Sequence, residues 1–331
     1  MLEMLAAYWR VLRHFRDEDL EAFPARHAEL YKRALETGDH SEVIQSFYGL
    51  LAPLYTAAYG PSWHFVPPEH RGQARLDAVR GLHQRIADLL EHAPGRRLLD
   101  VGSGVGGAMR DVAAHSGGEV VGITMAPSEV ETSKRASAEA GLAGRCRTVQ
   151  GDAQALPFDD GYFDGAYAIY SLKYFPTLKK VFGEIQRVLK PGGQFVIYDI
   201  VKTDDYDPLD TEHRRIVEGF EQACGMPPLH SDAAMIAEAA GVGLRCVERR
   251  DLSGRFTWYH YFESPLLPWL VMSPVVRRGL VPAAEFLGLL PRGFREINDG
   301  FISGIVEALL RAGRRDILSG SSLLRFAKPV A

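Results

Sequence analysis

Apolar residues in the middle of the chain follow two alternating periods. Short apolar runs are separated by stretches in which apolar residues recur at helical spacing. The runs that predict strands lie at 97–101, 119–123, 145–150, 165–169 and 194–200, and the helical stretches lie at 108–115, 127–140 and 177–189. The last helix should end at the Lys-Pro-Gly-Gly sequence of 190–193, which is a strong breaker. Strands that alternate with helices of this length predict an α/β fold with a doubly wound, mainly parallel sheet.

The segments on either side of this core are less regular. The N-terminal stretch 2–34 has apolar residues at helical spacing, which favours a helix packed on its own domain; a lid or an element that dips into a lipid surface is the alternative. After residue 201 we expect helices near 212–224 and 231–240 and strands near 244–250 and 323–328, with an apolar, proline-punctuated insert in between. The predicted organisation is an N-terminal helical lid segment (1–50), a ligand-binding core (51–201) and a remainder that completes the core and carries an apolar cap (202–331, with the cap at about 256–295).

Composition and charge narrow the class of protein. A net charge of −4 gives no general attraction to nucleic acid, and three widely spaced cysteines suit a reducing, cytoplasmic compartment. No run of about 18 apolar residues lacks a charge or a proline, which argues against a membrane span. Peripheral contact with a membrane and homo-oligomerisation both stay open. No group of His, Cys, Asp and Glu has metal-ligand spacing, so no metal is expected.

A glycine-rich turn follows the first predicted strand. The sequence Asp-Val-Gly-Ser-Gly-Val-Gly-Gly at 100–107 has the G-x-G-x-x-G spacing directly before a helix, which lets the backbone turn sharply and approach a ligand. The spacing alone is a weak signal, because dinucleotide enzymes share it. Asp100 would place a carboxylate near the ligand, which suits a cofactor that carries an amino acid better than a pyrophosphate. The second strand ends at Thr124 and Met125, without the acid that holds the ribose in NAD sites, and Asp152 and Ala153 follow the third strand.

This ordered set resembles the class I S-adenosylmethionine-dependent methyltransferases over about 97–201, which implies a Rossmann-like fold. Further segments are similar to the sterol methyltransferase family from about residue 47 to the end. They are Tyr-Thr-Ala-Ala-Tyr-Gly-Pro-Ser-Trp-His-Phe (55–65), Tyr-Asp-Ile-Val (198–201), Glu-His-Arg (212–214), Ile-Val-Glu-Ala (305–308) and Phe-Ala-Lys-Pro (326–329). The Ser-Leu-Lys-Tyr-Phe sequence (171–175) also resembles the sterol 4-methyltransferase type.

The resemblance implies a flat, apolar acceptor held under a cap and methylated at carbon, with S-adenosylmethionine as donor, S-adenosylhomocysteine as product and no metal. The residues that it places at the cofactor are Tyr55, Ser62, Asp100, Gly102, Ser103, Gly104, Thr124, Met125, Asp152 and Ala153. Those that it places at the acceptor are Tyr59, Trp63, Phe65, Tyr174, Trp258, Tyr261 and Phe262. Aromatic and leucine residues in the cap suit the wall of an apolar pocket, and ordinary core or an oligomer interface would explain them as well.

The sequence also departs from the family at positions that would carry acids. Thr56 follows the first tyrosine of the aromatic block, and Tyr170 to Tyr174 replace an acid and a histidine after the fourth strand. Such acids would accept the proton lost when a side-chain alkene is methylated. Their loss favours methylation of the ring carbon next to a 3-oxo group through an enolate, with His64, Tyr170 and Asp199 as catalytic candidates. Methylation of the sterol side chain at carbon 24, of a small isoprenoid or of a quinol are the alternatives, and a cofactor-binding protein without activity is a further one. Lys173 is expected on the surface.

Overall fold

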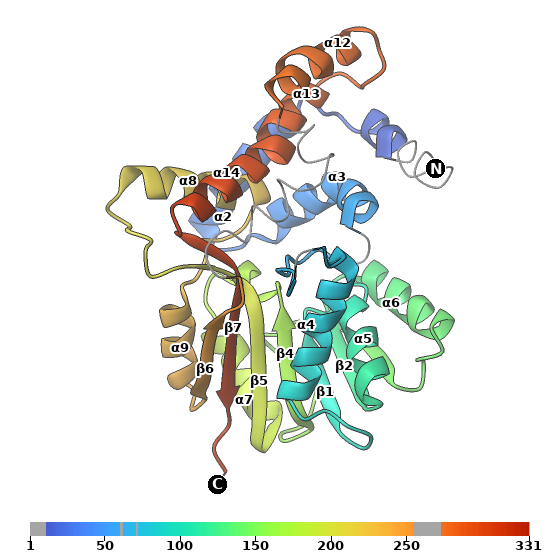
Figure 1. Ribbon diagram of the computed structural model, residues 1–331, viewed down its shortest axis with the longest axis vertical. Coiled ribbons are helices and arrows are strands. Elements are labelled where there is room, and N and C mark those ends of the chain that lie inside the picture. Colours follow the sequence, from blue (N-terminus) through green and yellow to red (C-terminus); the bar gives the residue numbers. More distant parts are fainter. Residues whose placement is uncertain (1–10, 60–61, 71, 254–272, 331) are drawn as a thin grey trace. The chain divides into compact units, whose positions relative to one another are not determined.

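The computed structural model describes residues 11–59, 62–70, 72–253 and 273–330 (Figure 1). The chain divides into two compact units. One combines residues 1–63, 203–229 and 255–318, and the other combines residues 64–202, 230–254 and 319–331. Among the described residues, no helix is both long enough and apolar enough to cross a bilayer.

The second unit is built on a seven-stranded sheet with the order β3-β2-β1-β4-β5-β7-β6. The pairs among β1 to β5 are parallel, and β6 pairs with β7 in the antiparallel sense. The strands are β1 (Arg97–Val101), β2 (Glu119–Thr124), β3 (Cys146–Gln150), β4 (Phe163–Ile169), β5 (Leu189–Lys202), β6 (Arg245–Asp251) and β7 (Leu318–Ala327). The predicted α/β class and the mainly parallel sheet are confirmed.

Helices cover both faces of this sheet (Figure 1). They are α4 (Arg75–Leu89), α5 (Gly107–Ser116), α6 (Pro127–Glu139), α7 (Lys179–Val188) and α9 (Asp232–Ala240). Successive strand residues point to opposite faces, so each strand supplies two hydrophobic clusters. Leu98 and Val120 pack with residues of α4 and α5, whereas Leu99 and Val121 pack with residues of α7 and α9. Because apolar residues on both sides of a strand are buried, the central strands form continuous apolar runs in the sequence.

The predicted elements of this unit agree with the observed ones to within a few residues, apart from the two long strands. Helix α7 ends at Val188, close to the predicted breaker, but β5 begins immediately at Leu189 and includes the Pro-Gly-Gly sequence. Gly192 adopts a positive φ of 78°, and its amide donates to the carbonyl of Lys328. The breaker therefore ends the helix and leads directly into a strand. Strand β7 begins five residues earlier than its predicted start at 323.

The first unit is helical in the described residues. Its helices are α2 (Phe23–Thr37), α3 (Ser41–Tyr59), α8 (Thr211–Cys224), α12 (Val281–Phe286), α13 (Phe294–Ile297) and α14 (Ser303–Arg314), with π-helical turns at Val276–Leu280 and Asn298–Ile302. Phe301 packs edge-on against Phe23 and His27, and Arg277 forms ion pairs with Asp299 and Glu307. Residues 256–272 of the predicted cap lie outside the described residues.

Candidate active site

The glycine turn lies at the carboxyl end of β1. Gly102, Gly104 and Gly106 all have positive φ, between 53° and 76°, a region in which only glycine is free of strain. The amides of Gly102 and Ser103 both donate to the carbonyl of Ile123 in β2. At Gly102 the turn is also closely packed, since a Cβ atom there would lie 2.4 Å from Cβ of Ser171. This position therefore requires glycine for two independent reasons.

Asp100, the last-but-one residue of β1, is buried on the face covered by α4 and α5. The hydroxyl of Tyr167, on the neighbouring strand β4, donates to its carboxylate at 3.0 Å. Burial raises the pKa of Asp100 to about 7, against the opposing effect of this hydrogen bond. A carboxyl group of this kind gains a proton near neutral pH unless a cation lies beside it.

The carboxyl end of β2 carries an acid that sequence reasoning missed. The Thr124 hydroxyl donates to the carboxylate of Glu129 in the first turn of α6. The other Glu129 oxygen would lie 3.9 Å from a Cβ atom placed on Gly104, so this carboxylate lies beside the glycine turn. The side chain of Met125 is 62% exposed. In the sequence, Glu129 lies five residues after Thr124, at the start of the predicted helix. An acid at the start of this helix, and not only at the end of the strand, could have indicated the position.

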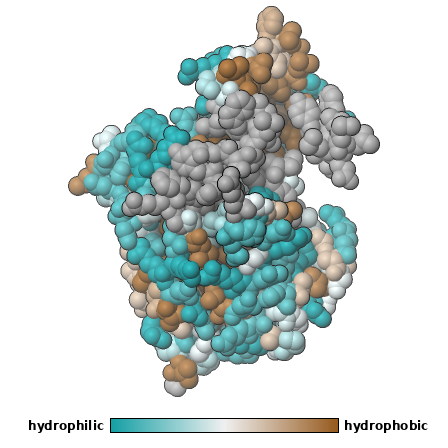
Figure 2. All heavy atoms as spheres, viewed as in Figure 1, coloured by the Kyte–Doolittle hydropathy of each residue, from teal (hydrophilic) through white to brown (hydrophobic). Residues whose placement is uncertain are grey.

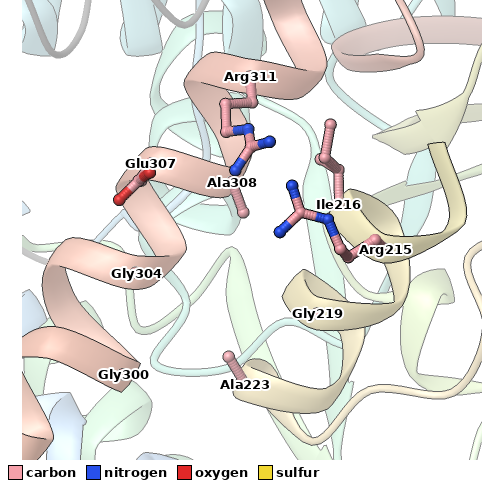
Figure 3. Close-up of a pocket in the computed structure, with 9 residues that line it drawn as sticks. All are labelled: Arg215, Ile216, Gly219, Ala223, Gly300, Gly304, Glu307, Ala308 and Arg311. Carbon is pink, nitrogen blue, oxygen red and sulfur yellow. The ribbon is translucent and has the colours of Figure 1, made fainter. Parts of the chain in front are cut away.

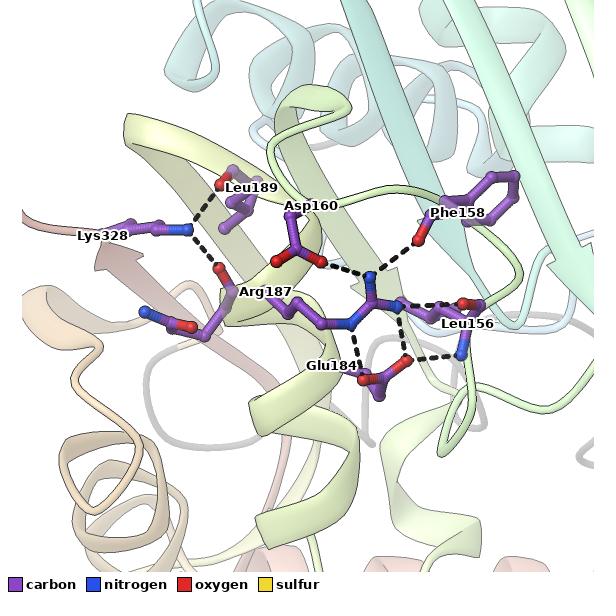
Figure 4. Close-up of polar contacts among 8 residues, drawn as sticks. Leu156, Phe158, Asp160, Glu184, Arg187, Leu189 and Lys328 are labelled. Atoms are coloured by element: carbon purple, nitrogen blue, oxygen red, sulfur yellow. Dashed lines mark hydrogen bonds and ion pairs between the residues drawn. The ribbon is translucent and has the colours of Figure 1, made fainter.

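Asp152 and Ala153 follow β3 in a loop that one arginine holds in place (Figure 4). Arg187 of α7 donates to the carbonyls of Leu156 and Phe158 and to the carboxylates of Asp160 and Glu184, at 2.7–3.0 Å. Glu184 in turn accepts the amide of Leu156 at 2.7 Å. The loop is thus fixed to α7 at both its backbone and its side chains. Near the same helix end, Lys328 donates to the carbonyls of Gln186 and Leu189.

Tyr170 follows β4 with a left-handed backbone (φ 55°), which is unusual for a residue other than glycine. This conformation turns the chain at the carboxyl end of the sheet. The hydroxyl of Tyr170 donates to the carbonyl of Gly320, and the next residue, Ser171, donates to the carbonyl of Val101 at 2.6 Å. Strained backbone of this kind is often found at functional sites.

Lys173 is buried, with a relative exposure of 6%, so the expectation that it lies on the surface is wrong. The turn at Tyr170 leads into a 3-10 helix (Leu172–Tyr174) instead of continuing the strand, and this brings Lys173 inward. Its ammonium lies 3.7 Å from the Asp199 carboxylate and 4.2 Å from the centroid of the Tyr170 ring. It also donates to the carbonyl of Tyr170.

Asp199, in β5, is fully buried. Its carboxylate accepts the amides of Leu172, Lys173 and Ile200 at 2.8–3.3 Å. Burial raises the pKa of Asp199, and Lys173 and these amides oppose that effect. Asp199 therefore fixes the turn after β4, and most of its acceptor sites are occupied.

His64 belongs to a chain of three polar residues on the face of the sheet covered by α4 and α5. Its Nε2 lies 3.0 Å from Nε2 of His83 in α4, and Nδ1 of His83 lies 2.7 Å from the carboxylate of Asp111 in α5. The rings of Tyr170 and Tyr198 lie 6.0 and 6.5 Å from the His64 ring. Sequence reasoning found His64 but neither of its partners, because 19 and 28 residues separate the members of the chain.

The predicted residues of the first unit form their own aromatic group. Trp63 stacks on Tyr48 at 5.7 Å and contacts Tyr55 at 6.1 Å. Ser62 is buried. Phe65 and Tyr174, in the second unit, are partly buried, and Phe65 packs edge-on against Tyr170. The side chain of Tyr59 and the residues Trp258, Tyr261 and Phe262 lie outside the described part of the structure.

A cavity of about 210 Å³ lies between α8 and α14 in the first unit (Figure 3). Small residues line it, including Gly219 and Gly304. The charged residues that line it are paired with neighbours, Arg215 and Arg311 with Glu212, and Glu307 with Arg277. A cavity of this size is smaller than the pockets that enclose drug-sized ligands. Within the described ranges, no cluster of His, Cys, Asp and Glu could hold a metal ion.

Comparisons with known proteins test the family resemblance. A methyltransferase domain model matches residues 99–197. The chain is 43% identical over 331 residues to the sterol 4-C-methyltransferase strm-1 of Caenorhabditis elegans, with 99% of this chain and 98% of that protein covered. The chain belongs to the sterol methyltransferase family. It is also 36% identical over 293 residues to the 24-methylenesterol C-methyltransferase 2 of Oryza sativa, with 87% of this chain and 78% of that protein covered.

The fold of this sterol methyltransferase family member has solved counterparts. The geranyl diphosphate C-methyltransferase of Streptomyces coelicolor superposes with a TM-score of 0.58 at 17% identity, covering 80% of this chain and 87% of that one. The expectation of a class I, S-adenosylmethionine-dependent methyltransferase is confirmed.

Proposed function

We propose that this protein methylates a sterol at ring carbon 4, next to a 3-oxo group, and uses S-adenosylmethionine as the methyl donor. The observation that carries the proposal is the near full-length similarity to a protein named as a sterol 4-C-methyltransferase. The residues after β4 give independent support. Tyr170 and the buried Lys173 lie there, and the ring of His64 lies 6.0 Å from that of Tyr170, so a group that can accept a proton is next to this end of the sheet.

The groups around the glycine turn fit S-adenosylmethionine, which supplies an electrophilic methyl group on a sulfonium when it is bound. Asp100, Glu129 and Asp152 place carboxylates at the ends of β1, β2 and β3. Carboxylates there complement an ammonium group, ribose hydroxyls and an adenine amino group, all of which donate hydrogen bonds. The raised pKa of Asp100 is expected of a carboxylate that awaits a cationic ligand.

We assign the role of base to His64. Burial lowers the pKa of His64 well below its usual value, so the imidazole is neutral and has a lone pair to offer. Among the described residues, its Nδ1 atom makes no hydrogen bond, whereas Nε2 is bonded to His83. In the proposed step the C4–H bond breaks and its proton goes to His64. The electron pair forms the enolate, whose carbon forms the new C–CH3 bond as the methyl–sulfur bond breaks.

Tyr170 and Asp199 act differently in this scheme. The hydroxyl of Tyr170 already donates to Gly320, so its ring serves as a wall beside His64 rather than as a proton donor. Asp199 accepts three amides and pairs with Lys173, which supports a positioning role instead of a role as base. The positive charge of Lys173 lies close to the Tyr170 ring and is balanced by the Asp199 carboxylate.

The test is an assay with methyl-labelled S-adenosylmethionine and two acceptors, a 3-oxo sterol and a sterol with a side-chain alkene. We expect label at carbon 4 of the 3-oxo sterol, located by mass spectrometry. Label on the side chain would contradict the proposal and favour methylation at carbon 24, the activity in the names of several relatives. Label on neither acceptor would reject sterols as substrates and favour a smaller isoprenoid or a quinol.

We further propose that the protein meets its apolar acceptor at an anionic membrane surface. Support comes from an exposed apolar face on the helical segment that includes α12, coloured brown in Figure 2. Phe286 is 90% exposed there. The other large apolar residues exposed in this segment are Val275, Leu280, Leu287 and Leu289. Arg278 and Arg292 of the same segment are exposed, whereas Glu285 accepts the amides of Gly293 and Arg295. Apolar residues flanked by arginines suit an anionic lipid surface.

Flotation with vesicles that contain phosphatidylserine tests this proposal. We expect the wild type to float with the vesicles and Phe286→Glu/Leu287→Glu to remain in solution. Leu35→Glu, at an exposed apolar position of α2, is the matched control and should float as the wild type does. Equal flotation of all three proteins would contradict this use of the α12 face.

A further inference from the structure

The chain Asp111–His83–His64 links a partly exposed carboxylate to a buried imidazole. His83 is fully buried, and the Asp111 side chain is 34% exposed. The three residues come from separate elements, since His83 lies on α4, Asp111 on α5 and His64 on the segment before α4. Their surroundings are an apolar cluster that includes Leu82, Val112 and Tyr198. Polar side chains in such a setting lose hydration, so their hydrogen bonds to one another fix their orientation.

The chemistry of the three groups fixes which nitrogens carry protons. An ionised carboxylate only accepts hydrogen bonds, so Nδ1 of His83 must donate to Asp111. A neutral His83 then has a lone pair on Nε2, and the hydrogen bond at 3.0 Å requires His64 to donate from its own Nε2. This tautomer leaves the lone pair of His64 on Nδ1. The carboxylate of Asp111 thus sets the tautomer of His64 through His83.

We propose that His83 and Asp111 are positioning residues that turn His64 into the terminal member of a two-histidine proton relay. This inference rests on the proposed function, in which His64 takes the acceptor's proton. When Nδ1 of His64 takes that proton, the proton on its Nε2 passes to Nε2 of His83. The product of the step is a neutral His64 and an imidazolium at His83, whose Nδ1–H still bonds to Asp111. Protons and charge balance without a further reactant.

The electrostatics around the two imidazoles favour this final position of the charge. Burial lowers the pKa of His64 most, and the positive charges of Arg75 and Lys173, as well as a positive charge on His83, lower it further. The rings of Tyr170 and Tyr198 also lie near His64, at 6.0 and 6.5 Å. A positive charge that stayed on His64 would therefore be poorly stabilised. On His83 the same charge lies beside a carboxylate, which stabilises it. The relay explains how a buried histidine with a lowered pKa can still serve as a base.

The experiment compares four variants by their kcat, their affinity for S-adenosylmethionine and the pH profile of kcat/KM, with the labelled methyl donor and the sterol that the wild type accepts. Asp111→Asn keeps the shape of the pair but removes the charge. His83→Gln keeps hydrogen-bonding groups but cannot pass a proton on. His64→Gln removes the proposed base. Asp88→Asn is the matched control, because Asp88 and His115 form a similar pair between the same two helices, at 2.9 Å and closer to solvent.

We expect kcat to fall by about 10²-fold or more in His64→Gln and His83→Gln, and by a smaller factor in Asp111→Asn. Affinity for S-adenosylmethionine should stay unchanged in His83→Gln and Asp111→Asn. Asp88→Asn should match the wild type in kcat, in this affinity and in the pH profile. In Asp111→Asn the acidic limb of the pH profile should move to lower pH by about one unit or more, because the base loses the carboxylate that favours its protonated form.

Three results would overturn the inference. If His64→Gln abolishes activity while His83→Gln and Asp111→Asn keep it within twofold, His64 is the base but no relay exists. If Asp111→Asn lowers kcat without moving the acidic limb, Asp111 has only a structural role. If His64→Gln keeps full activity, the base assignment fails and the relay fails with it. Should His83→Gln not fold, Asp111→Asn decides, since its side chain reaches solvent and its shape is preserved.

Discussion

The carboxyl ends of β1 and β2 and the carboxyl ends of β4 and β5 are built in opposite ways. At β1 and β2 the main chain determines the local structure, through glycines with positive φ and amides that bond to Ile123. Near β4 and β5 buried side chains determine it, with Lys173 against Asp199 and His64 against His83. A turn determined by the main chain needs small residues in one short segment. A cluster of buried polar and charged side chains needs partners from several elements, and each buried charge requires compensation.

The largest effect should come from breaking the charge pair at β5. Asp199→Asn leaves Lys173 buried without a countercharge, and such a loss costs about 3–5 kcal/mol. We expect the free energy of unfolding, measured by urea denaturation, to fall by this amount. The double variant Lys173→Met/Asp199→Asn should recover a large part of it. Glu131→Gln breaks the exposed pair with Lys134 and should cost less than about 1 kcal/mol. Equal stability of Asp199→Asn and the wild type would show that the pair does not carry charge.

A smaller but still large effect is expected at the glycine turn. Gly102→Ala adds a Cβ atom that overlaps Ser171 and places alanine at a φ of 76°. The two effects together should lower stability by about 2–4 kcal/mol. Gly161→Ala is the control, because Gly161 has a φ of 64° but its nearest neighbour would lie 4.0 Å away, so only about 1 kcal/mol is expected. Adding Ser171→Gly to Gly102→Ala should restore the part of the loss due to overlap. No recovery would mean that the close contact is not the cause.

The smallest effect concerns the pH dependence of the affinity for S-adenosylmethionine. It tests whether the side chain of Asp100, just before the glycine turn, contributes to binding. The pKa of Asp100 is raised to about 7, so the ligand-free protein holds a proton there below this pH. Ionisation of Asp100 favours a cationic ligand, so the affinity for S-adenosylmethionine should rise as pH increases from 6 to 8, by about tenfold at most. Asp100→Asn should bind more weakly and without this dependence. Isothermal titration at pH 6, 7 and 8 measures both, and a variant that kept the full pH dependence would assign it to another group.

The same contrast explains what could be predicted from the sequence. The positions of the glycine turn, Asp100, Thr124 and Asp152 could be predicted because each is defined by a few adjacent residues at the end of a strand. The arrangement around the three catalytic candidates could be predicted only in part. His64, Tyr170 and Asp199 do lie in one unit, with Tyr170 close to His64 and joined through Lys173 to Asp199.

The residues that were missed lack a local signal. His83 and Asp111 lie on helices whose apolar spacing gives no reason to single them out. The prediction for Lys173 failed because it assumed that β4 continues in strand conformation past Ile169. Tyr170 adopts a left-handed conformation although it is not a glycine, so the sequence gives no sign of this turn. The turn changes the direction in which Lys173 points. Partners that meet only through tertiary packing cannot be read from spacing along one segment.

The position of β7 has a consequence for the making of the protein. This strand lies between β5 and β6 in the sheet, yet the ribosome produces it after the other six strands and after helices α12, α13 and α14. Until it emerges, β6 has no neighbour in the sheet and β5 presents an open edge, which is a site where strands of other chains can add. The growing chain must therefore hold an unfinished sheet through the synthesis of a helical region that belongs to the other unit. Chaperone demand during translation should be concentrated in this interval, and it should end when the residues of β7 have left the ribosomal tunnel.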